Sequence, residues 1–332
     1  MAFDWSTQFP RWPSEAWAEA PLETLALKYD TVEQHGWYDN LNLTVEQILS
    51  EVQDGETVID YSGGTGILAK RLLDASPERQ YGIIIADSSP KFLRLALEKF
   101  RDESRLAFRL IRYLKDERRL QTLDEVIDAD GLGALADNLV STNAIHLYYG
   151  LVDTMTSWKR MLRPGGRVYI QSGNINNPDA AKGSWIIDET VEHIHRAAVD
   201  MVRDQDEYKD LRSALENHTF MDAHDRLRAK YFLPVRPLET YTNAINEAGL
   251  SVVDVQCRSI AARVDEWNSF LSVYHEGVLG WVGGAQKITG EPAPSDVIER
   301  RKNMIRKAMD IVFEGRDTFD ANWTYIRATN PG

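Results

Sequence analysis

Cysteine is nearly absent from this sequence. The 332 residues include one cysteine, Cys257, which excludes an internal disulfide and a cluster of thiolate ligands around a metal ion. Cys257 follows the strand-like segment 252–255, so we interpret it as a small core residue rather than as a nucleophile.

Long apolar runs are absent too. No stretch reaches the roughly 18 uninterrupted apolar residues that favour a membrane-spanning helix. The first residues also lack the basic region and apolar run of a secretion signal. We therefore expect a soluble, cytoplasmic protein that does not insert into a membrane.

Positive charge is in deficit. Lysine and arginine together number 38, against 51 aspartates and glutamates, and the formal net charge is −13. Binding of nucleic acid depends on cationic side chains that neutralise phosphates. The densest basic segment, 115–119, carries its own acids, so we interpret it as a solvated helix face and expect no nucleic-acid partner.

Apolar residues, by contrast, are abundant. They make up 43% of the chain, and nine tryptophans are among them. A chain of this length and composition can bury a large core in one elaborated domain or in two.

The most informative segment is 58–66, which predicts a strand followed by a glycine-rich turn and a helix. Val58 and Ile59 are β-branched and suit a buried strand. Gly63, Gly64 and Gly66 allow backbone angles and close approaches that side chains would block. The helix that follows points its positive, amide-rich end at a ligand above the turn. The segment therefore predicts a nucleotide cradle.

Two kinds of cofactor fit such a turn. Residues 64–69 satisfy the G-x-G-x-x-G/A pattern of dinucleotide binding, with Asp87 about 20 residues further on, which leaves an NAD(P)-dependent oxidoreductase as an alternative. Asp60, at the end of the strand, would repel a pyrophosphate but attract an ammonium group. S-adenosylmethionine has an ammonium group, a sulfonium and no phosphate, so Asp60 favours this second cofactor.

Five segments in order resemble the class I S-adenosylmethionine-dependent methyltransferases. In the first, Asp60, Gly64 and Gly66 match the motif acidic-x-Gly-x-Gly-x-Gly. Ser62 stands in place of the first glycine of that motif. The other four segments are 81–87, 126–132, 139–148 and 161–167.

The resemblance implies an α/β fold with a seven-stranded Rossmann-like sheet, whose cofactor-binding core covers 41–173, 232–261 and 320–330. The segments outside this core predict an N-terminal extension at 1–40, which forms an aromatic-rich cap, and a helical lid built from two insertions, 174–231 and 262–319. Apolar residues recur at helical spacing in both insertions. Their helices would meet above the carboxyl ends of the strands, where ligands bind in open α/β sheets.

The resemblance also implies which residues surround S-adenosylmethionine. Asp87 is expected to hold the ribose, because one carboxylate accepts two hydrogen bonds from a vicinal diol. Capping of the next helix by Asp87, Ser88 or Ser89 remains the alternative. Asp128 is expected near the adenine amino group, with Asp130 as its alternative. The predicted set is Asp60, Ser62, Gly63, Gly64, Gly66, Asp87, Ser88, Asp128, Ala129 and Asn143.

Methyl transfer from a sulfonium is an in-line displacement, which requires a general base only when the nucleophile carries a proton of high pKa. His146, after the fourth predicted strand, is the leading base candidate, and His275 is the second. The ends of the fourth and fifth predicted strands carry Asn143 and Asn174 rather than the acids of catechol-type metal sites. We therefore expect metal-independent transfer.

The acceptor is the least defined part of the prediction. The acidic composition and the absence of an Asn-Pro-Pro-Tyr segment after the fourth strand favour O- or N-methylation of a small molecule. The aromatic residues of the insertions suit a hydrophobic or aromatic metabolite, and they suit an ordinary core equally well. A homodimer and a non-catalytic S-adenosylmethionine-binding protein remain open.

Overall fold

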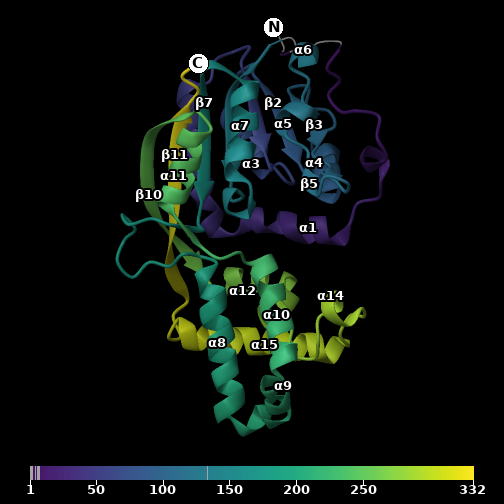
Figure 1. The fold of residues 1–332 in the computed structure, drawn as a ribbon, viewed down its shortest axis with the longest axis vertical. Helices are drawn as coiled ribbons and strands as arrows, with labels where there is room; N and C mark the ends of the chain where they lie inside the picture. The colour runs from purple at the N-terminus through teal and green to yellow at the C-terminus, as the bar shows by residue number, and fades with distance from the viewer. Residues whose placement is uncertain (1–2, 4, 6–7, 133) are drawn as a thin grey trace.

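The computed structural model describes the chain except for residues 1–2, 4, 6–7 and 133 and the side chains of 129 and 130. Figure 1 shows two parts, a sheet with helices on its faces and, below it, a group of helices. Both termini lie at the end of the sheet part that is far from those helices. No described helix is both long and apolar enough to cross a membrane.

Seven strands form one sheet. They are β1 (Thr57–Tyr61), β2 (Gly82–Asp87), β3 (Leu106–Leu110), β6 (Ala136–Thr142), β7 (Leu162–Ser172), β10 (Ser251–Arg263) and β11 (Thr318–Thr329). Their order is β10-β11-β7-β6-β1-β2-β3, and only β11 runs antiparallel to its neighbours. The order reverses between β1 and β6, which is where open α/β sheets bind ligands. The predicted seven-stranded α/β fold is confirmed.

Helices cover both faces of this sheet, because successive strand residues point to opposite sides. Val58 of β1 joins the apolar cluster on one face, and its neighbour Ile59 joins the cluster on the other. The Val58 face is covered by α2 (Asn42–Glu51), α3 (Ile67–Ala75) and α4 (Pro90–Lys99). The Ile59 face is covered by α5 (Leu123–Val126), α7 (Leu151–Met161) and α11 (Leu238–Glu247), and α6 (Ala129–Leu132) follows α5.

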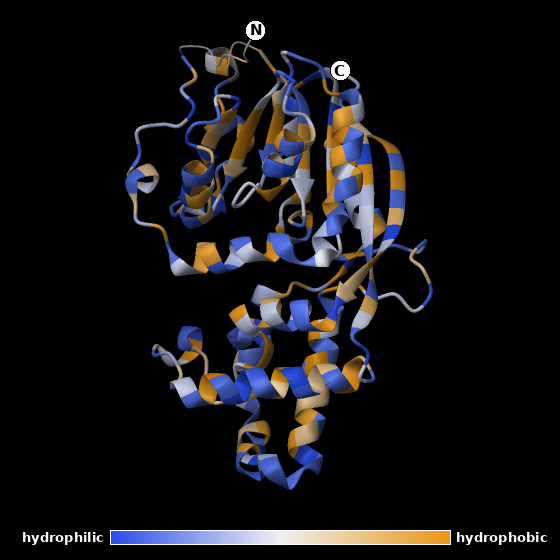
Figure 2. Cartoon of the chain, turned by 180° about the vertical axis from the view of Figure 1, so that it is seen from behind, coloured by the Kyte–Doolittle hydropathy of each residue, from blue (hydrophilic) through white to orange (hydrophobic). Residues whose placement is uncertain are grey.

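The helices below the sheet come from two separate stretches of chain. The first stretch contributes α8 (Glu189–Asp204), α9 (Arg212–Glu216) and α10 (His218–Tyr231), and the second contributes α12 (Val264–Val273), α13 (His275–Leu279), α14 (Gln286–Thr289) and α15 (Ser295–Val312). Ile194 of α8 and Ile305 of α15 belong to one buried apolar cluster. Figure 2 shows orange and blue turns alternating along these helices, as expected for amphipathic helices that pack on one another.

A two-stranded ribbon connects the two parts. β11 pairs with β7 only from Thr324 to Thr329, whereas it pairs with β10 from Thr318 onward. The ribbon therefore continues past β7 toward α15 and α12 (Figure 1). The N-terminal helix α1 (Thr24–Asp30) lies along the boundary between the two parts. Short strands pair elsewhere, β4 (Tyr113–Leu114) with β5 (Arg119–Leu120) and β8 (Ile175–Asn176) with β9 (Arg236–Pro237).

The predicted helix face at the basic segment 115–119 is wrong. This segment forms the turn of the β4–β5 hairpin. Arg118 adopts a left-handed backbone with φ 55°, which ends any helical repeat at this point. Arg119 pairs with Glu117 and Glu125, so the segment neutralises its own charge at the surface.

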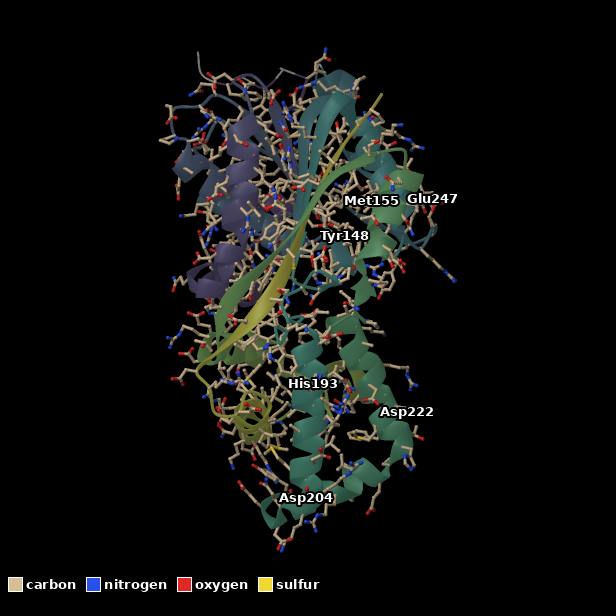
Figure 3. The ribbon with its side chains drawn as sticks, turned by 90° about the vertical axis from the view of Figure 1, so that its left-hand side faces the viewer. Tyr148, Met155, His193, Asp204, Asp222 and Glu247 are labelled. Carbon is tan, nitrogen blue, oxygen red and sulfur yellow. The ribbon has the colours of Figure 1, made fainter. Side chains whose placement is uncertain are left out.

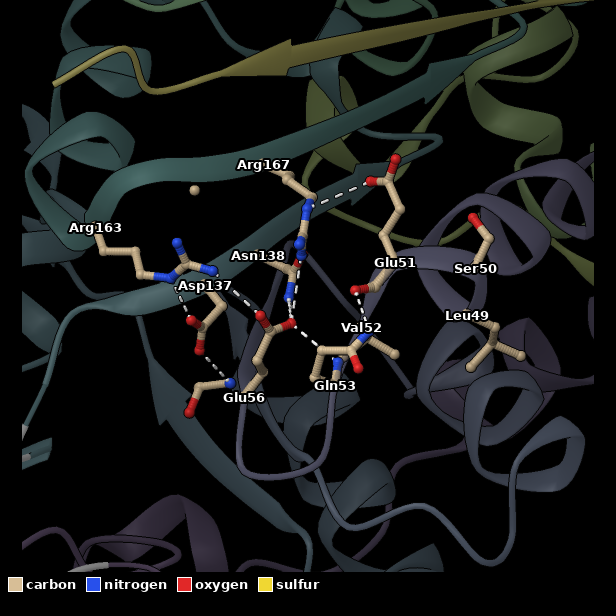
Figure 4. A network of polar contacts seen from close by, with 12 residues as sticks. Leu49, Ser50, Glu51, Val52, Gln53, Glu56, Asp137, Asn138, Arg163 and Arg167 are labelled. Atoms are coloured by element: carbon tan, nitrogen blue, oxygen red, sulfur yellow. Dashed lines mark hydrogen bonds and ion pairs between the residues drawn. The ribbon is translucent and has the colours of Figure 1, made fainter.

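A polar network connects the strand ends that lie away from the group of helices below the sheet (Figure 4). Glu56, just before β1, accepts hydrogen bonds from Arg163 at 3.1 Å, Arg167 at 3.3 Å and Asn138 at 3.1 Å. Burial opposes ionisation of Glu56, but hydrogen bonds from Gln53, Asn138 and Arg167 outweigh it and lower the pKa of this carboxyl. The network therefore favours the folded state while Glu56 is ionised.

Replacement of this carboxylate tests that contribution. Glu56→Gln is expected to destabilise the protein at pH 7 by about 1–3 kcal/mol, because two arginines lose their shared anionic partner. A carboxyl with a lowered folded pKa stabilises the protein above its unfolded pKa, and this contribution is lost as the pH falls through the folded pKa. The difference between variant and wild type in denaturant unfolding should therefore shrink below about pH 4.

Glu247→Gln, at an exposed position of α11, is the matched control and should change stability by less than about 0.5 kcal/mol. A loss of stability by Glu56→Gln that stays the same from pH 7 down to pH 3 would show that the charge of Glu56 contributes nothing.

Candidate functional site

The glycine turn between β1 and α3 has a left-handed backbone at several positions. Ser62, Gly64 and Gly66 have φ values of 62°, 57° and 79°. Ser62, which replaces a glycine of the family motif, is held in this conformation with its hydroxyl 2.7 Å from the Tyr148 hydroxyl that donates to it. A Cβ atom at Gly63 would lie 2.6 Å from an Asp60 carboxylate oxygen, so only glycine fits there.

Asp60 lies directly beneath this turn and is fully buried. Neither of its carboxylate oxygens has a hydrogen-bond partner among the described residues. Burial raises the pKa of Asp60 to about 7, and the neighbouring Asp87 carboxylate adds to the shift. Burial of a carboxylate without a partner costs free energy. A cation bound above the turn would reduce this cost, because only the backbone of Gly63 would separate it from Asp60.

Asp87, at the end of β2, fixes the turn from the side. One of its oxygens accepts a hydrogen bond from the Gly64 amide at 2.8 Å, and the other accepts one from the Ser89 amide at 2.7 Å. Burial raises the pKa of Asp87, and the backbone hydrogen bonds partly oppose this. Ser89, rather than Asp87 or Ser88, is the N-cap residue of α4. Ser88 is exposed.

A small cavity, here called the turn cavity, lies over the glycine turn. Thr65 contributes a buried hydroxyl that has no hydrogen-bond partner among the described residues. Nothing in the sequence distinguishes this threonine from the other spacer positions of the motif. The cavity is lined by Tyr29, Tyr38, Leu41, Ser62, Gly63, Gly64, Thr65, Ile67, Leu68, Thr142 and Asn143.

The predicted adenine segment, 126–132, runs from the last residue of α5 to the end of α6. Asp128 is exposed there, and its carboxylate lies 3.3 Å from the position of a Cβ atom at Gly131. The side chains of Ala129 and Asp130 are outside the described part of the structure. Neither Asp60, Asp87 nor Asp128 lines the turn cavity itself.

A second and larger cavity, here called the aromatic cavity, has a volume of about 310 Å³. Ten of its lining residues are aromatic: Tyr29, Trp37, Tyr38, Phe92, Tyr231, Phe232, Trp267, Phe270, Tyr274 and Trp323. They come from the N-terminal segment, α4, the helical part and β11. The remaining lining residues are Asn143, His146, Leu147, Gly173, Asn174, Ile187, Asp188 and Lys230.

Three residues line both cavities, namely Tyr29, Tyr38 and Asn143. The two tyrosine hydroxyls are 3.3 Å apart. Asn143 follows β6 with φ 52°, an uncommon conformation for a residue other than glycine. Its side-chain oxygen accepts a hydrogen bond from the Trp323 indole at 3.0 Å, and its backbone amide donates one to the Gln171 backbone carbonyl at 2.8 Å. These contacts hold Asn143 at the boundary between the two cavities.

His146 lies in the 3₁₀ turn Ile145–Leu147 and lines the aromatic cavity. Its Nδ1 atom is 3.1 Å from the Ser172 hydroxyl. Burial, together with the positive charge of Arg236, lowers the pKa of His146 to about 4. The ring is therefore neutral at pH 7.

His275, the second base candidate, is placed elsewhere. It begins α13, and its Nδ1 accepts a hydrogen bond from Arg301 at 2.8 Å. Burial, followed by the charge of Arg301, lowers the pKa of His275 to about 4. Since His275 does not line the aromatic cavity, the structure does not bring it together with His146.

Of the other histidines, His35 lies in the N-terminal segment, and His193, His195, His218 and His224 lie in the helical part. Figure 3 shows His193 on α8 and Asp222 on α10, far from Tyr148 beside the glycine turn. No three histidine, cysteine, aspartate or glutamate side chains among the described residues could hold a metal ion together.

Asp188 is the polar residue of the aromatic cavity that the sequence did not reveal. It precedes α8, its amide donates to the Asn174 side chain at 2.9 Å, and burial raises the pKa of its carboxyl to about 7. In the sequence it stands after Ile186 and Ile187, where an apolar helical repeat was the stronger signal.

Comparison with known proteins identifies the family. A model described as the ubiE/COQ5 methyltransferase family matches residues 24–230. The ubiquinone/menaquinone biosynthesis C-methyltransferase UbiE of Coxiella burnetii is 22% identical over 214 residues, which are 61% of this chain and 77% of that protein. The hybrid PKS-NRPS synthetase apdA of Emericella nidulans is 26% identical over 132 residues, which are 39% of this chain but 3% of that protein.

The YcgJ protein of Bacillus subtilis has a similar fold, with a TM-score of 0.50, 14% identity and coverage of 89% of this chain and 99% of that chain. At this identity the likeness concerns the fold alone. The family match decides against the NAD(P)-dependent oxidoreductase that the glycine turn had left open. The chain belongs to the ubiE/COQ5 methyltransferase family and is an S-adenosylmethionine-dependent methyltransferase.

Proposed function

We propose that this enzyme methylates an oxygen or a nitrogen of a small molecule that binds in the aromatic cavity, without a metal ion. The observation that carries this proposal is that Tyr29, Tyr38 and Asn143 line both cavities. In-line transfer requires the donor carbon and the acceptor atom to face each other over a few ångströms with water excluded. Two cavities that share three lining residues lie next to each other. A donor in one and an acceptor in the other would therefore meet this requirement.

The residues around the turn cavity fit S-adenosylmethionine. The left-handed turn presents backbone amides, Asp60 is a buried carboxylate without a partner, and the Thr65 hydroxyl is a donor without a partner. When bound, the cofactor supplies a methyl group on a positively charged sulfur. We assign its binding to the residues predicted from the sequence, with Thr65 added and with Asn143 at the methyl end.

The segments outside the sheet would close the site. Tyr29 and Tyr38 from the N-terminal segment cover the turn cavity, and Tyr231 and Trp267 from the helical part cover the aromatic cavity. We therefore propose that 1–40 acts as a cap and that 174–231 and 262–319 act as one lid. The opening of these segments would admit the acceptor and release the product.

His146 is the base candidate that this geometry retains. Its neutral ring lines the aromatic cavity and can accept a hydrogen bond from, or donate one to, the acceptor. A pKa of about 4 makes it a weak base at neutral pH. We therefore assign His146 mainly to orienting the acceptor, and we assign no catalytic role to His275.

The function is tested by offering acceptors in chemical classes. The enzyme is incubated with S-adenosylmethionine and with separate pools of phenols, carboxylic acids and amines, and S-adenosylhomocysteine is measured by mass spectrometry. The proposal predicts acceptor-dependent release with at least one pool. Tight binding of S-adenosylmethionine with no release from any pool would overturn the proposal of O- or N-methylation of a small molecule.

Asp87→Asn tests the assignment of the cofactor site. Loss of the charge is expected to weaken S-adenosylmethionine binding at least about tenfold in calorimetry, the equivalent of one charge-assisted hydrogen bond. The melting temperature should also fall, because Asp87 holds the amides of Gly64 and Ser89. Asp74→Asn, at an exposed position of α3, is the control and should leave the affinity unchanged. Equal affinities of wild type and folded Asp87→Asn would remove Asp87 from the site.

The state of His146 is tested by NMR of the histidine rings. A titration from pH 8 to pH 5.5 should leave the His146 ring neutral, because burial and Arg236 lower its pKa to about 4. The resonance is assigned by its absence from His146→Asn. A midpoint for His146 near 6.5 would contradict the assignment of a desolvated ring.

A further inference from the structure

One wall of the aromatic cavity carries a carboxylate. Asp188 lines the cavity beside Ile187, and it is partly exposed. No ion pair to Asp188 is found among the described residues; its carboxylate has a hydrogen bond with the Asn174 side chain, and the cavity that it lines is mostly aromatic. A carboxylate in apolar surroundings is unfavourable unless a cation pairs with it. A positively charged ligand could therefore supply the cationic partner that Asp188 lacks.

The aromatic walls are arranged as a continuous set of ring contacts. Trp37 stacks on Trp323 with centroids 6.1 Å apart and meets the edge of Trp267 at 6.2 Å. Phe270 stacks on Trp267 at 5.0 Å and contacts Tyr274 at 4.9 Å. Aromatic faces attract cations, most strongly where water is excluded. These rings therefore favour the same kind of ligand as the carboxylate does.

The surface next to the aromatic cavity is negatively charged, as Asp188 is. A groove of about 260 Å³ adjoins the aromatic cavity and shares Asp188 and Phe232 with it. Glu189, Glu192 and Asp225 also line this groove. An acidic groove raises the local concentration of cations and steers them inward. It provides a second observation, independent of the aromatic walls, that points to a cationic ligand.

Two basic residues, Arg228 and Lys230, line these surfaces and leave an excess of acids. Arg228 of the groove pairs with Glu192 at 3.2 Å and with Asp225 at 3.0 Å, so its charge is neutralised locally. Lys230 lines the aromatic cavity but is exposed, and it forms no ion pair with Asp188. Its charge is therefore screened by water more strongly than that of Asp188.

We propose that the aromatic cavity binds the methyl acceptor as a cationic amine, with the ammonium group paired to Asp188 and packed against the rings of Trp37, Trp267 and Phe270. This inference rests on the proposed function and narrows it to N-methylation. The acceptor would enter through the acidic groove past Phe232.

The transfer balances as follows. The ammonium gives an N–H proton to the Asp188 carboxylate, and the freed nitrogen lone pair forms the new N–C bond. The C–S bond breaks, and its electron pair remains on sulfur, which yields S-adenosylhomocysteine. The positive charge moves from sulfur to nitrogen, where the aromatic faces stabilise it, and Asp188 returns the proton to water through the groove. Burial raises the pKa of Asp188 to about 7, which makes it a better proton acceptor than an exposed carboxylate.

The test compares two probes of the same shape. The enzyme saturated with S-adenosylhomocysteine is titrated in a calorimeter with (3-hydroxyphenyl)trimethylammonium and with its neutral carbon isostere, 3-tert-butylphenol. The proposal predicts that the cation binds at least about tenfold more tightly, which is the scale of a desolvated cation–π contact plus an ion pair. Equal affinities, or tighter binding of the phenol, would overturn the proposal and favour a neutral acceptor.

The variant Asp188→Asn keeps the shape and removes the charge. It is expected to weaken binding of the cation about tenfold or more and binding of the phenol less than about twofold. Asp200→Asn, on the helix α8 that follows Asp188 but away from both surfaces, is the matched control and should change neither affinity. An equal loss for both probes in Asp188→Asn would assign Asp188 to structure alone and contradict the proposal.

Binding of S-adenosylmethionine, measured in the same way, separates the two levels of inference. If the cofactor does not bind, the proposed function fails, whichever probe the cavity prefers. If the cofactor binds and the amine pool alone leads to release of S-adenosylhomocysteine, both inferences are supported. Release with the phenol pool alone would leave the proposed function in place and overturn the amine assignment.

Discussion

The hydrogen bond from the Gly64 amide to the Asp87 carboxylate is the contact on which the site depends. It joins the end of β2 to the turn that follows β1, while the second oxygen of Asp87 holds the start of α4. The left-handed turn, the buried Asp60 beneath it and the cavity above it all require this geometry. A parallel sheet brings the two strand ends to the same edge, so this contact follows directly from the fold.

A second constraint comes from aromatic packing at the boundary between sheet and helices. Trp37 from the N-terminal segment lies between Trp323 of β11 and Trp267 of α12. Residues that are nearly 300 positions apart in the sequence thereby form one wall. The Asn143 side chain is held by Trp323, so the same packing that attaches the helical part also positions the residue between the two cavities. Under the proposed function, recognition of the acceptor and placement of the donor would therefore depend on the same packing.

The sequence predicted the elements whose signals are local. The β-branched residues, the glycines at fixed spacing and the acid at the end of β2 specify the strand, the turn and its partner within about 30 residues. The prediction of a helix face at 115–119 is wrong, because charge composition does not report a left-handed residue such as Arg118. The role of Asp188 was also out of reach, since it depends on Asn174 and on rings from α10 and α12 that only the folded chain brings together.

The central claim is that donor and acceptor face each other across the wall formed by Tyr29, Tyr38 and Asn143. The most direct measurement is a crystal structure of the enzyme with S-adenosylhomocysteine and (3-hydroxyphenyl)trimethylammonium bound together. We expect the sulfur atom to lie beside Asn143 and the ammonium group to lie in the aromatic cavity on the side of Asp188. A sulfur atom that points away from Asn143, or an ammonium group bound outside the aromatic cavity, would contradict it.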